Sequence, residues 1–353
     1  MIVPPGSTIG IIGGGQLGRM LAIAAAQLGY KCHVFAPDAD PPAGDVAAKV
    51  TRGDFSDQVA LRTFADAVDV ATYEFENLPA TALALLGNTL VPGTASLEIA
   101  QDRGVEKRFI EAQGARVASW RAIDDEADAR SAEAALGLPF VLKSRRLGYD
   151  GKGQAWVREP GAAVSGWDSI DREPAIAEAA VAFAAEFSVI LARARSGEIA
   201  VWDAPLNHHE GGILRRSTVP AGDLIAGQVA QATRIATQIA HALGHVGVLT
   251  VEYFACADGP IVNEIAPRVH NSGHWTIEGA ATSQFEQHIR AICGLPLGST
   301  KRIAQNVRMD NLIGDDVDAW PDLLAEPGVS LHLYGKGASR PGRKMGHVTR
   351  LGD

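Results

Sequence analysis

Two glutamates that are expected to face each other carry the clearest chemical capability in this sequence. The stretch 246–268, V-G-V-L-T-V-E-Y-F-A-C-A-D-G-P-I-V-N-E-I-A-P-R, has two apolar runs around a turn, which predicts an antiparallel hairpin. A turn centred on Asp258 places Glu252 opposite Glu264, with Cβ atoms roughly 4.5 to 5.5 Å apart. Mg²⁺ shared with nucleotide phosphates would relieve their repulsion. A shared proton or a one-residue register shift is the alternative.

A loop rich in glycine and basic residues suits a polyphosphate. Residues 139–154 read P-F-V-L-K-S-R-R-L-G-Y-D-G-K-G-Q, a short strand that ends at Lys143 and then a loop. A lysine fixed on a strand supplies a positioned charge, and Gly148, Gly151 and Gly153 let the loop fold over phosphates. An ordinary solvated hairpin turn would explain the glycines but not the cations.

Two further clusters of polar and basic residues could bind anions. The segment P-R-V-H-N-S-G-H-W-T, 267–276, places donors after a strand, where they could hold a small oxyanion. The segment Y-G-K-G-A-S-R-P-G-R-K-M-G-H, 334–347, adds Lys336, Arg343 and Lys344. Taken alone, the second segment is typical of a solvated tail, although its glycines and proline favour an ordered series of turns.

The first part of the chain shows alternating strand and helix signals. Apolar runs at 8–12, 31–36 and 68–73 predict strands, and 19–28 predicts a helix after the glycines of 13–18. This order is typical of a parallel sheet with crossover helices, so the first domain is predicted to be α/β.

The glycine turn allows three interpretations. Gly13, Gly15 and Gly18 match G-x-G-x-x-G, with Asp38 at a plausible distance for a ribose-binding acid, which favours a dinucleotide. Backbone amides at a helix N-terminus would bind a phosphate monoester equally well, and this is the interpretation we favour. A tight turn without a ligand is the third possibility.

Polar residues also follow the strand at 68–73, within T-Y-E-F-E-N-L-P. Glu74, Glu76 and Asn77 stand at its carboxyl end, where open α/β sheets bind ligands, and carboxylates there could accept sugar hydroxyls. Alternatively, these residues only begin the next helix.

Composition limits the class of protein. The chain has 353 residues, 46% hydrophobic and 21% charged, with a formal net charge of -9, which argues against a protein that coats nucleic acid. The three cysteines are too few and too scattered for a disulfide framework. No signal peptide or membrane span is recognised, so we expect a cytoplasmic protein without membrane or nucleic-acid partners.

The motifs together resemble the ATP-grasp superfamily, and within it the N5-carboxyaminoimidazole ribonucleotide synthetases. G-G-G-Q-L-G-R-M, L-G-Y-D-G-K-G-Q, N-E-I-A-P-R-V-H-N-S-G-H-W-T and R-P-G-R-K-M-G-H occur in family order over nearly the whole chain. The resemblance implies an ATP-grasp fold, α/β and α+β, with an N-terminal parallel-sheet (pre-ATP-grasp) domain at 1–105. A linker and lid would span 106–185, and a C-terminal domain with the basic motif 186–353. The chain stops soon after that motif, at T-R-L-G-D, so we expect a thin C-terminal cover.

The implied reaction is the ATP- and bicarbonate-dependent carboxylation of 5-aminoimidazole ribonucleotide to its N5-carboxy form, through carboxyphosphate, in purine biosynthesis. ADP and phosphate are the other products, and the resemblance implies a homodimer. The residues implied for ATP are Arg103, Lys143, Gly148, Tyr149, Asp150, Gly151, Lys152, Gly153, Gln154, Glu178, Val181, Glu186, His209 (or its neighbour His208), Asn263 and Glu264.

The remaining implied roles concern the metal, bicarbonate and the aminoimidazole nucleotide. Glu252 and Glu264 would hold Mg²⁺. The residues implied for bicarbonate and its phosphorylated form are Arg268, His270 and Asn271. Those implied for the aminoimidazole nucleotide are Asp150, Glu76, Lys336 and Arg343, with Gln16 and Leu17 near its phosphate. Of all these, Arg268, His270, Asn271, Lys336, Arg343 and Asp150 are the implied catalytic residues.

Three other functions compete with this one. A formate-using glycinamide ribonucleotide transformylase shares the superfamily, but R-P-G-R-K-M-G-H and H-N-S-G-H-W-T argue against it. An NAD(P)-dependent oxidoreductase is favoured only by the first glycine motif. A nucleotide-sensing module without catalysis would require that Glu252 and Glu264 do not bind a metal ion.

Overall fold

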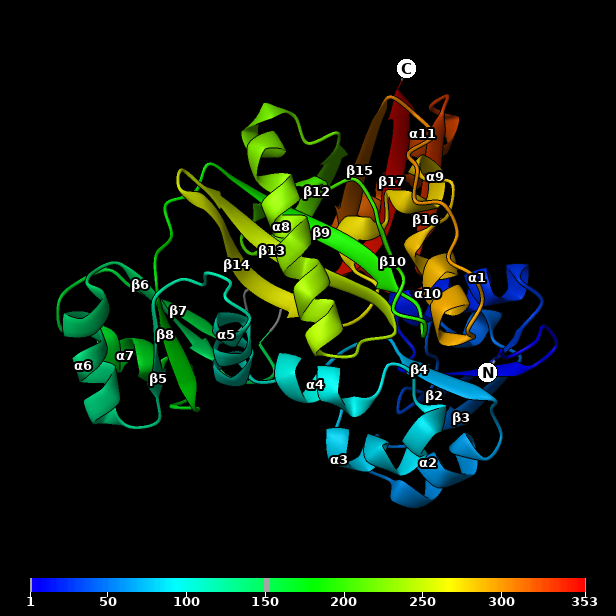
Figure 1. Cartoon of the computed structure of the whole chain (residues 1–353), viewed down its shortest axis with the longest axis horizontal. Coiled ribbons are helices and arrows are strands. Elements are labelled where there is room, and N and C mark those ends of the chain that lie inside the picture. Colours follow the sequence, from blue (N-terminus) through cyan, green and yellow to red (C-terminus); the bar gives the residue numbers. More distant parts are fainter. Residues whose placement is uncertain (1, 149–152, 353) are drawn as a thin grey trace.

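The computed structural model describes residues 2–148 and 153–352, which form three sheets (Figure 1). The first sheet is parallel, with strand order β3-β2-β1-β4. Its elements are the strands Thr8–Ile12 (β1), Lys31–Ala36 (β2), Lys49–Arg52 (β3) and Val70–Tyr73 (β4) and the helices Gln16–Gln27 (α1), Gln58–Ala65 (α2), Ala80–Leu83 (α3) and Thr94–Ala100 (α4). The predicted α/β opening is confirmed, and β2 has the predicted bounds.

Helix α1 begins three residues earlier than the apolar pattern predicts. Gly15 is its N-cap, and Gln16, Leu17 and Gly18 form the first turn. The amides of Gly15 and Gly18 donate to the carboxylate of Glu74, which follows β4. A carboxylate at a helix N-terminus is stabilising, but its source lies far away in the sequence, so local pattern could not reveal the early start.

The second sheet is a small antiparallel unit that projects at the lower left of Figure 1. Its order is β5-β8-β6-β7, and its helices cover one face around a core that includes Phe140, Leu142 and Trp167. Its elements are Trp120–Ile123 (β5), Glu126–Leu136 (α6), Phe140–Ser144 (β6), Gln154–Val157 (β7), Ala163–Asp168 (α7) and Ala175–Ala179 (β8), preceded by the helix Arg103–Ala112 (α5). Lys143 lies on β6, as predicted for a lysine fixed on a strand.

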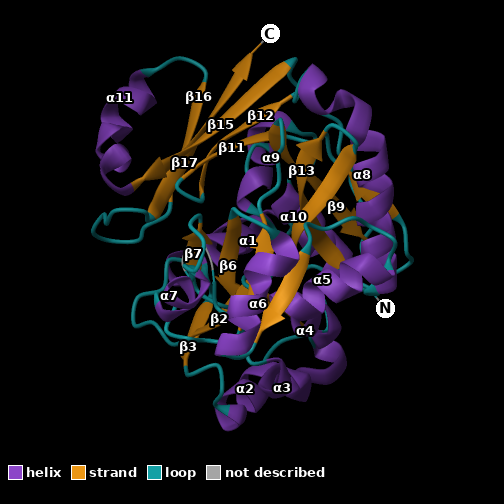
Figure 2. Cartoon of the chain, turned by 90° about the vertical axis from the view of Figure 1, so that its left-hand side faces the viewer, coloured by secondary structure: helices purple, strands orange, loops and turns teal. Residues whose placement is uncertain are grey.

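The third sheet is the largest and follows the order β14-β13-β9-β11-β12-β15-β17-β16, with β10 beside β9. Figure 2 shows helix α8 along its β9 and β13 side and helix α10 between this sheet and α1. Its strands are Ala185–Arg193 (β9), Ile199–Val201 (β10), Leu206–Glu210 (β11), Ile213–Val219 (β12), Gly247–Cys256 (β13), Gly259–Ala266 (β14), Asn306–Ile313 (β15), Val329–Leu333 (β16) and Lys344–Gly352 (β17). Its helices are Asp223–Ala242 (α8), Thr276–Gly279 (α9), Gln284–Ile292 (α10) and Trp320–Ala325 (α11).

The predicted hairpin is β13 and β14, and its register is the predicted one. Glu252 pairs with Glu264, and a bulge follows, since Tyr253 pairs with Val262 and leaves Asn263 as the extra residue. The alternative of a one-residue shift at the glutamates is therefore excluded.

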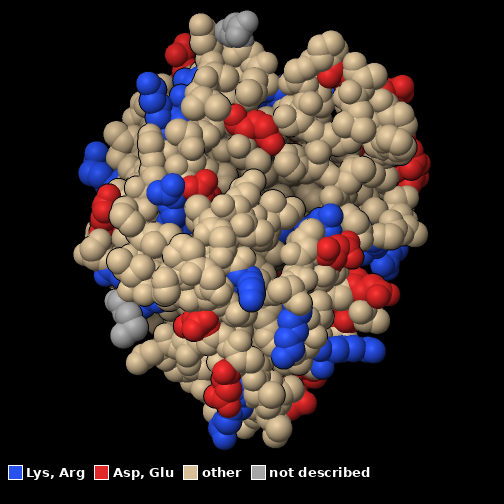
Figure 3. All heavy atoms as spheres, turned by 90° about the vertical axis from the view of Figure 1, so that its right-hand side faces the viewer, with Lys and Arg blue, Asp and Glu red and all other residues tan. Residues whose placement is uncertain are grey.

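The surface shows mixed charge on the face in Figure 3. Basic and acidic side chains alternate there, and no large patch of one sign forms among the described residues of that face. None of the helices in the described ranges combines the length and the apolar character needed to cross a bilayer.

Candidate active site

A cavity of about 1010 Å³ brings most of the predicted site residues together. It is lined from all three sheets, so its wall is discontinuous in sequence. The predicted residues that line it are Gln16, Leu17, Glu76, Arg103, Lys143, Gly148, Gln154, Glu178, Val181, Glu186, His209, Glu252, Asn263, Glu264, Arg268, His270 and Asn271. Gly153, Lys336 and Arg343 are described but do not line it, and Tyr149, Asp150, Gly151 and Lys152 lie outside the described residues.

The facing glutamates form a site suited to a hard cation. Burial raises the pKa of Glu252, and the charge of Glu264 raises it further. Arg103 Nη1 lies 3.2 Å from Glu264 Oε2 and offsets part of this charge. Because two partly buried carboxylates face each other with one arginine beside them, these residues fit Mg²⁺, which takes carboxylate oxygens and keeps sites for water and phosphate.

A histidine and a third glutamate extend this wall. His209 Nδ1 forms an ion pair with Glu186 Oε2. Burial would lower the pKa of His209, but the hydrogen bond to Glu186 and the charges of Glu252 and Glu264 raise it overall. A β-bulge between His208 and His209 turns the second toward the cavity, whereas the His208 side chain is 61% exposed. Of the two alternatives, His209 is therefore the cavity residue.

A buried carboxylate holds two lysines at the lid side of the cavity. Glu178 Oε1 accepts from Lys107 Nζ and Glu178 Oε2 from Lys143 Nζ, both at 2.5 Å. Burial would raise the pKa of Glu178, but the two lysines lower it to about 2. Lys107 was not predicted, although Arg103, Lys107 and Ile110 share one helical face, a spacing that could have identified it. Because both oxygens are engaged, we assign the Glu178 side chain to positioning Lys143.

Replacing Glu178 with alanine is expected to destabilise the protein by about 3 to 5 kcal/mol, because two buried ammonium groups lose their partner. The lowered pKa also sets a pH dependence: the stabilisation is complete above the ordinary value of 4.5 and is lost as the pH falls toward 2. Denaturant unfolding of both proteins between pH 7 and pH 3 measures this.

The matched control is Glu126→Ala, whose carboxylate pairs with Arg130 on the surface. It should cost less than about 1 kcal/mol. Equal losses in the two variants would contradict the role given to Glu178.

The loop after β14 forms an oxyanion corner. Arg268 makes a two-pronged ion pair with Glu76, with Nη2 2.9 Å from Oε1. Both polar atoms of the Asn271 side chain are buried without a partner among the described residues, yet the side chain lines the cavity. A small polar ligand would satisfy them.

His270 completes this corner as a neutral group. Its Nδ1 is 2.8 Å from Ser272 Oγ, and its Nε2 is 3.3 Å from Glu252 Oε1. Burial, followed by the charge of Arg268, holds the pKa of His270 well below its ordinary value. The imidazole therefore adds hydrogen-bonding capacity beside Arg268 without a second positive charge.

Part of the glycine turn is engaged by the chain itself, while Gln16 and Leu17 line the cavity, and a phosphate monoester at this turn stays a prediction. Besides its bond from Gly15, Glu74 accepts from the Gly18 amide at 2.6 Å. Burial raises the pKa of Glu74, and these amide bonds oppose that rise. A Cβ on Gly14 would lie 2.3 Å from the Pro41 side chain, and Asp38 is exposed away from the cavity. The Gly15 and Gly18 amides are thus engaged by Glu74, and the Gly14 backbone packs closely against Pro41.

The C-terminal basic motif is a series of turns between β16 and β17. Gly335, Gly337 and Gly342 have positive φ, and the Tyr334 amide donates to Met345, which closes the loop. Lys344, which the sequence placed in the basic cluster without a specific role, lines the cavity. Lys336 lies over the Tyr334 ring, and its charge opposes the rise that burial causes in the pKa of Glu74, so it acts near the cavity without lining it.

An apolar corner of the cavity was also missed. The rings of Phe183 and Phe254 stack with centroids 4.7 Å apart, next to Val181 and Trp156. These residues come from β7, from the stretch after β8, and from β13, so only the fold brings them together. A flat base could pack against this apolar surface.

Comparisons with known proteins agree with this arrangement. Three family models match in succession: a ribonucleotide synthetase preATP-grasp domain at residues 6–101, an ATP-grasp domain at 108–285, and a phosphoribosylaminoimidazole carboxylase C-terminal domain at 308–353. The N5-carboxyaminoimidazole ribonucleotide synthase of Brucella melitensis is 52% identical over 98% of this chain and 97% of its own.

The chain belongs to the N5-carboxyaminoimidazole ribonucleotide synthase family. A solved ADP complex of a synthetase of this family has a TM-score of 0.95 at 42% identity and covers 100% of this chain and 94% of its own. The Aspergillus clavatus synthase, solved with ADP and 5-aminoimidazole ribonucleotide, has a TM-score of 0.91 at 31% identity, with 98% and 94% covered. The predicted family and ATP-grasp fold are thereby confirmed.

Proposed function

We propose that this protein carboxylates 5-aminoimidazole ribonucleotide at N5, using ATP and bicarbonate, as the names of its family relatives describe. The observation that carries the proposal is the meeting in one cavity of a facing carboxylate pair, a positioned lysine and an oxyanion corner. These are the parts needed to activate a small oxyanion with a nucleotide.

ATP binds between the lid and the hairpin. The base packs against the apolar corner that contains the stacked rings of Phe183 and Phe254. Lys143 meets the phosphates as a point charge held by Glu178. Glu252 and Glu264 would hold Mg²⁺, which when bound would neutralise the charge that develops on the transferred phosphoryl group.

Bicarbonate occupies the corner of Arg268 and Asn271. One bicarbonate oxygen attacks the γ-phosphorus of ATP, the bond to the β-phosphate oxygen breaks, and ADP leaves. Arg268 orients the anion with the guanidinium N–H groups that its ion pair with Glu76 leaves available, and the Asn271 amide gains the partner that it lacks. The product of this step is carboxyphosphate.

The exocyclic amine of the aminoimidazole nucleotide then attacks the carboxyl carbon, either of carboxyphosphate or of CO₂ released from it. The bond between that carbon and the phosphate oxygen breaks, so phosphate leaves, and the nitrogen loses a proton. Glu76, Gln16 and Leu17 lie in the same cavity and receive the nucleotide, with Lys336 and Arg343 completing its binding. Asp150 keeps its proposed role in this step, although it lies outside the described residues.

Replacing Arg343 with lysine is expected to raise the KM for aminoimidazole ribonucleotide about tenfold and to leave that for ATP nearly unchanged, because the charge stays but the two-pronged geometry is lost. Initial rates at varied concentrations of each substrate measure both constants. If Arg343→Ala left substrate-dependent phosphate release intact, the binding role would be refuted.

Phosphate release tests the overall proposal. We expect release from ATP that depends on bicarbonate and rises when aminoimidazole ribonucleotide is added. Activity with formate and glycinamide ribonucleotide instead, or a change in NADH absorbance without phosphate release from ATP, would overturn it.

The division into 1–105, 106–185 and 186–353 follows these roles: nucleotide reception, ATP cover and phosphoryl chemistry. The cytoplasmic location and the homodimer stay predictions from the sequence. Light scattering of the purified chain measures whether it forms a homodimer.

A further inference from the structure

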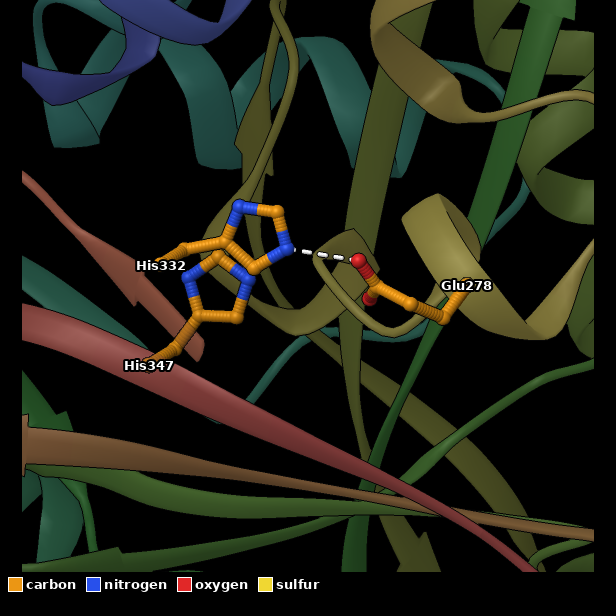
Figure 4. A group of neighbouring side chains, drawn as sticks. All are labelled: Glu278, His332 and His347. Carbon is orange, nitrogen blue, oxygen red and sulfur yellow. Dashed lines mark hydrogen bonds and ion pairs between the residues drawn. The ribbon is translucent and has the colours of Figure 1, made fainter. Parts of the chain in front are cut away.

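A second group of metal-ligating side chains lies outside the ATP cavity. Glu278 on α9, His332 on β16 and His347 on β17 each offer a ligand atom, and these atoms all lie within 4.8 Å of one another. Figure 4 shows both imidazoles presenting Nε2 toward the Glu278 carboxylate. None of the three lines the cavity described above, so the proposed reaction does not use them.

Two atoms of this group lack partners. His332 Nε2 lies 2.6 Å from Glu278 Oε1, and the Tyr334 hydroxyl lies 2.8 Å from His347 Nδ1. His347 Nε2 and Glu278 Oε2, however, are buried without a partner in the described part of the chain. His347 itself is 0% exposed. Buried polar atoms are nearly always satisfied, so a small bridging group is expected between them.

The donor set indicates which group this is. Two imidazoles and one carboxylate match the ligands of Zn²⁺, whereas Mg²⁺ prefers oxygen alone. If Nδ1–H donates to the Tyr334 oxygen, Nε2 keeps its lone pair for a metal.

The geometry requires only a small adjustment. The His332 and His347 rings are stacked, with centroids 4.5 Å apart and an interplanar angle of 8°. Their Nε2 atoms therefore point the same way, and a tilt of one ring would direct both lone pairs at one ion. His332 can move, because its side chain is 30% exposed.

We propose that Glu278, His332 and His347 bind a Zn²⁺ ion, with a fourth position open to water. The site joins α9, which directly follows the loop of the oxyanion corner, to the two strands that flank the C-terminal basic motif. The ion thus acts as a structural clamp behind the active site and takes no part in phosphoryl transfer.

Metal binding to the purified full-length chain tests this. The chain is stripped with a chelator, returned to buffer with Mg²⁺, and titrated with Zn²⁺ against a chromophoric indicator. We expect one Zn²⁺ per chain with a Kd below about 1 μM, and a rise in Tm of about 3 °C or more at saturation. With Co²⁺ as the probe, visible bands typical of a four-coordinate site should appear.

Variants separate this site from adventitious binding. His332→Gln and Glu278→Gln should each abolish the Tm rise and the Co²⁺ bands. His208→Gln should keep both, since His208 is an exposed histidine that also pairs with a glutamate, Glu210, at 3.2 Å. Absence of stoichiometric binding in the unaltered chain, retention of it in His332→Gln, or its loss in His208→Gln would overturn the proposal. If Glu278→Gln fails to fold, the exposed position of His332 makes His332→Gln decisive.

Discussion

Replacing Glu264 with glutamine is expected to lower ATP turnover by about 100-fold or more, because one of the two facing carboxylates that would hold Mg²⁺ loses its charge. The metal requirement should rise as well, so the Mg²⁺ concentration at half-maximal rate is expected to increase. Steady-state phosphate release over a range of Mg²⁺ concentrations measures both effects.

The stability of Glu264→Gln, in contrast to its turnover, should stay the same or increase. Burial raises the pKa of Glu106 to about 8, and the charge of Glu264 contributes to that rise, as it does for Glu252. The substitution relieves this repulsion while it weakens the ion pair with Arg103. Thermal unfolding should therefore give a Tm that is unchanged or higher.

The control for this substitution is Asp258→Asn in the turn of the same hairpin. Asp258 is exposed and forms an ion pair with Arg116 at 2.7 Å. It lies in the turn at the end of the hairpin, away from the paired residues Glu252 and Glu264. The ATP turnover of Asp258→Asn should equal that of the unaltered protein. Unchanged turnover of Glu264→Gln at saturating Mg²⁺ would refute the metal assignment.

The second large effect is expected at Arg268. Arg268→Lys keeps the charge but not the planar fork that binds Glu76 and would orient bicarbonate, so kcat should fall by about 100-fold. The KM for ATP should change little, because the ATP phosphates meet other cations. A fall in kcat together with kcat/KM would identify an interaction made in the transition state.

Arg116→Lys is the matched control, since it changes the same residue type in a surface ion pair. It should leave kcat unaltered. An Arg268→Lys enzyme with normal kcat and a raised KM for ATP would instead assign Arg268 to nucleotide binding.

The features that follow local patterns could be predicted from the sequence. Strand β2, the parallel opening sheet and the register of Glu252 against Glu264 follow from short-range periodicity and one turn. The oxyanion corner also follows one strand directly, so its residues are neighbours in sequence as well as in space.

Features that depend on distant segments could not be predicted in this way. Glu74 fills the glycine turn from 56 residues away, and nothing in G-G-G-Q-L-G distinguishes amides that meet a ligand from amides that meet a carboxylate. Glu178 on β8 joins Lys107 on α5 to Lys143 on β6. The bulge that orients His209 depends on its pairing with β12. Such contacts are fixed by tertiary packing.

The transfer of oxygen from bicarbonate to phosphate tests the central claim most directly. The protein is incubated briefly with ATP, Mg²⁺, aminoimidazole ribonucleotide and ¹⁸O-labelled bicarbonate, and the released phosphate is analysed by mass spectrometry. Because a bicarbonate oxygen attacks the γ-phosphorus and stays on it when the carbon-oxygen bond breaks, each phosphate should carry one ¹⁸O. Phosphate without the label, released at the rate of product formation, would contradict the account.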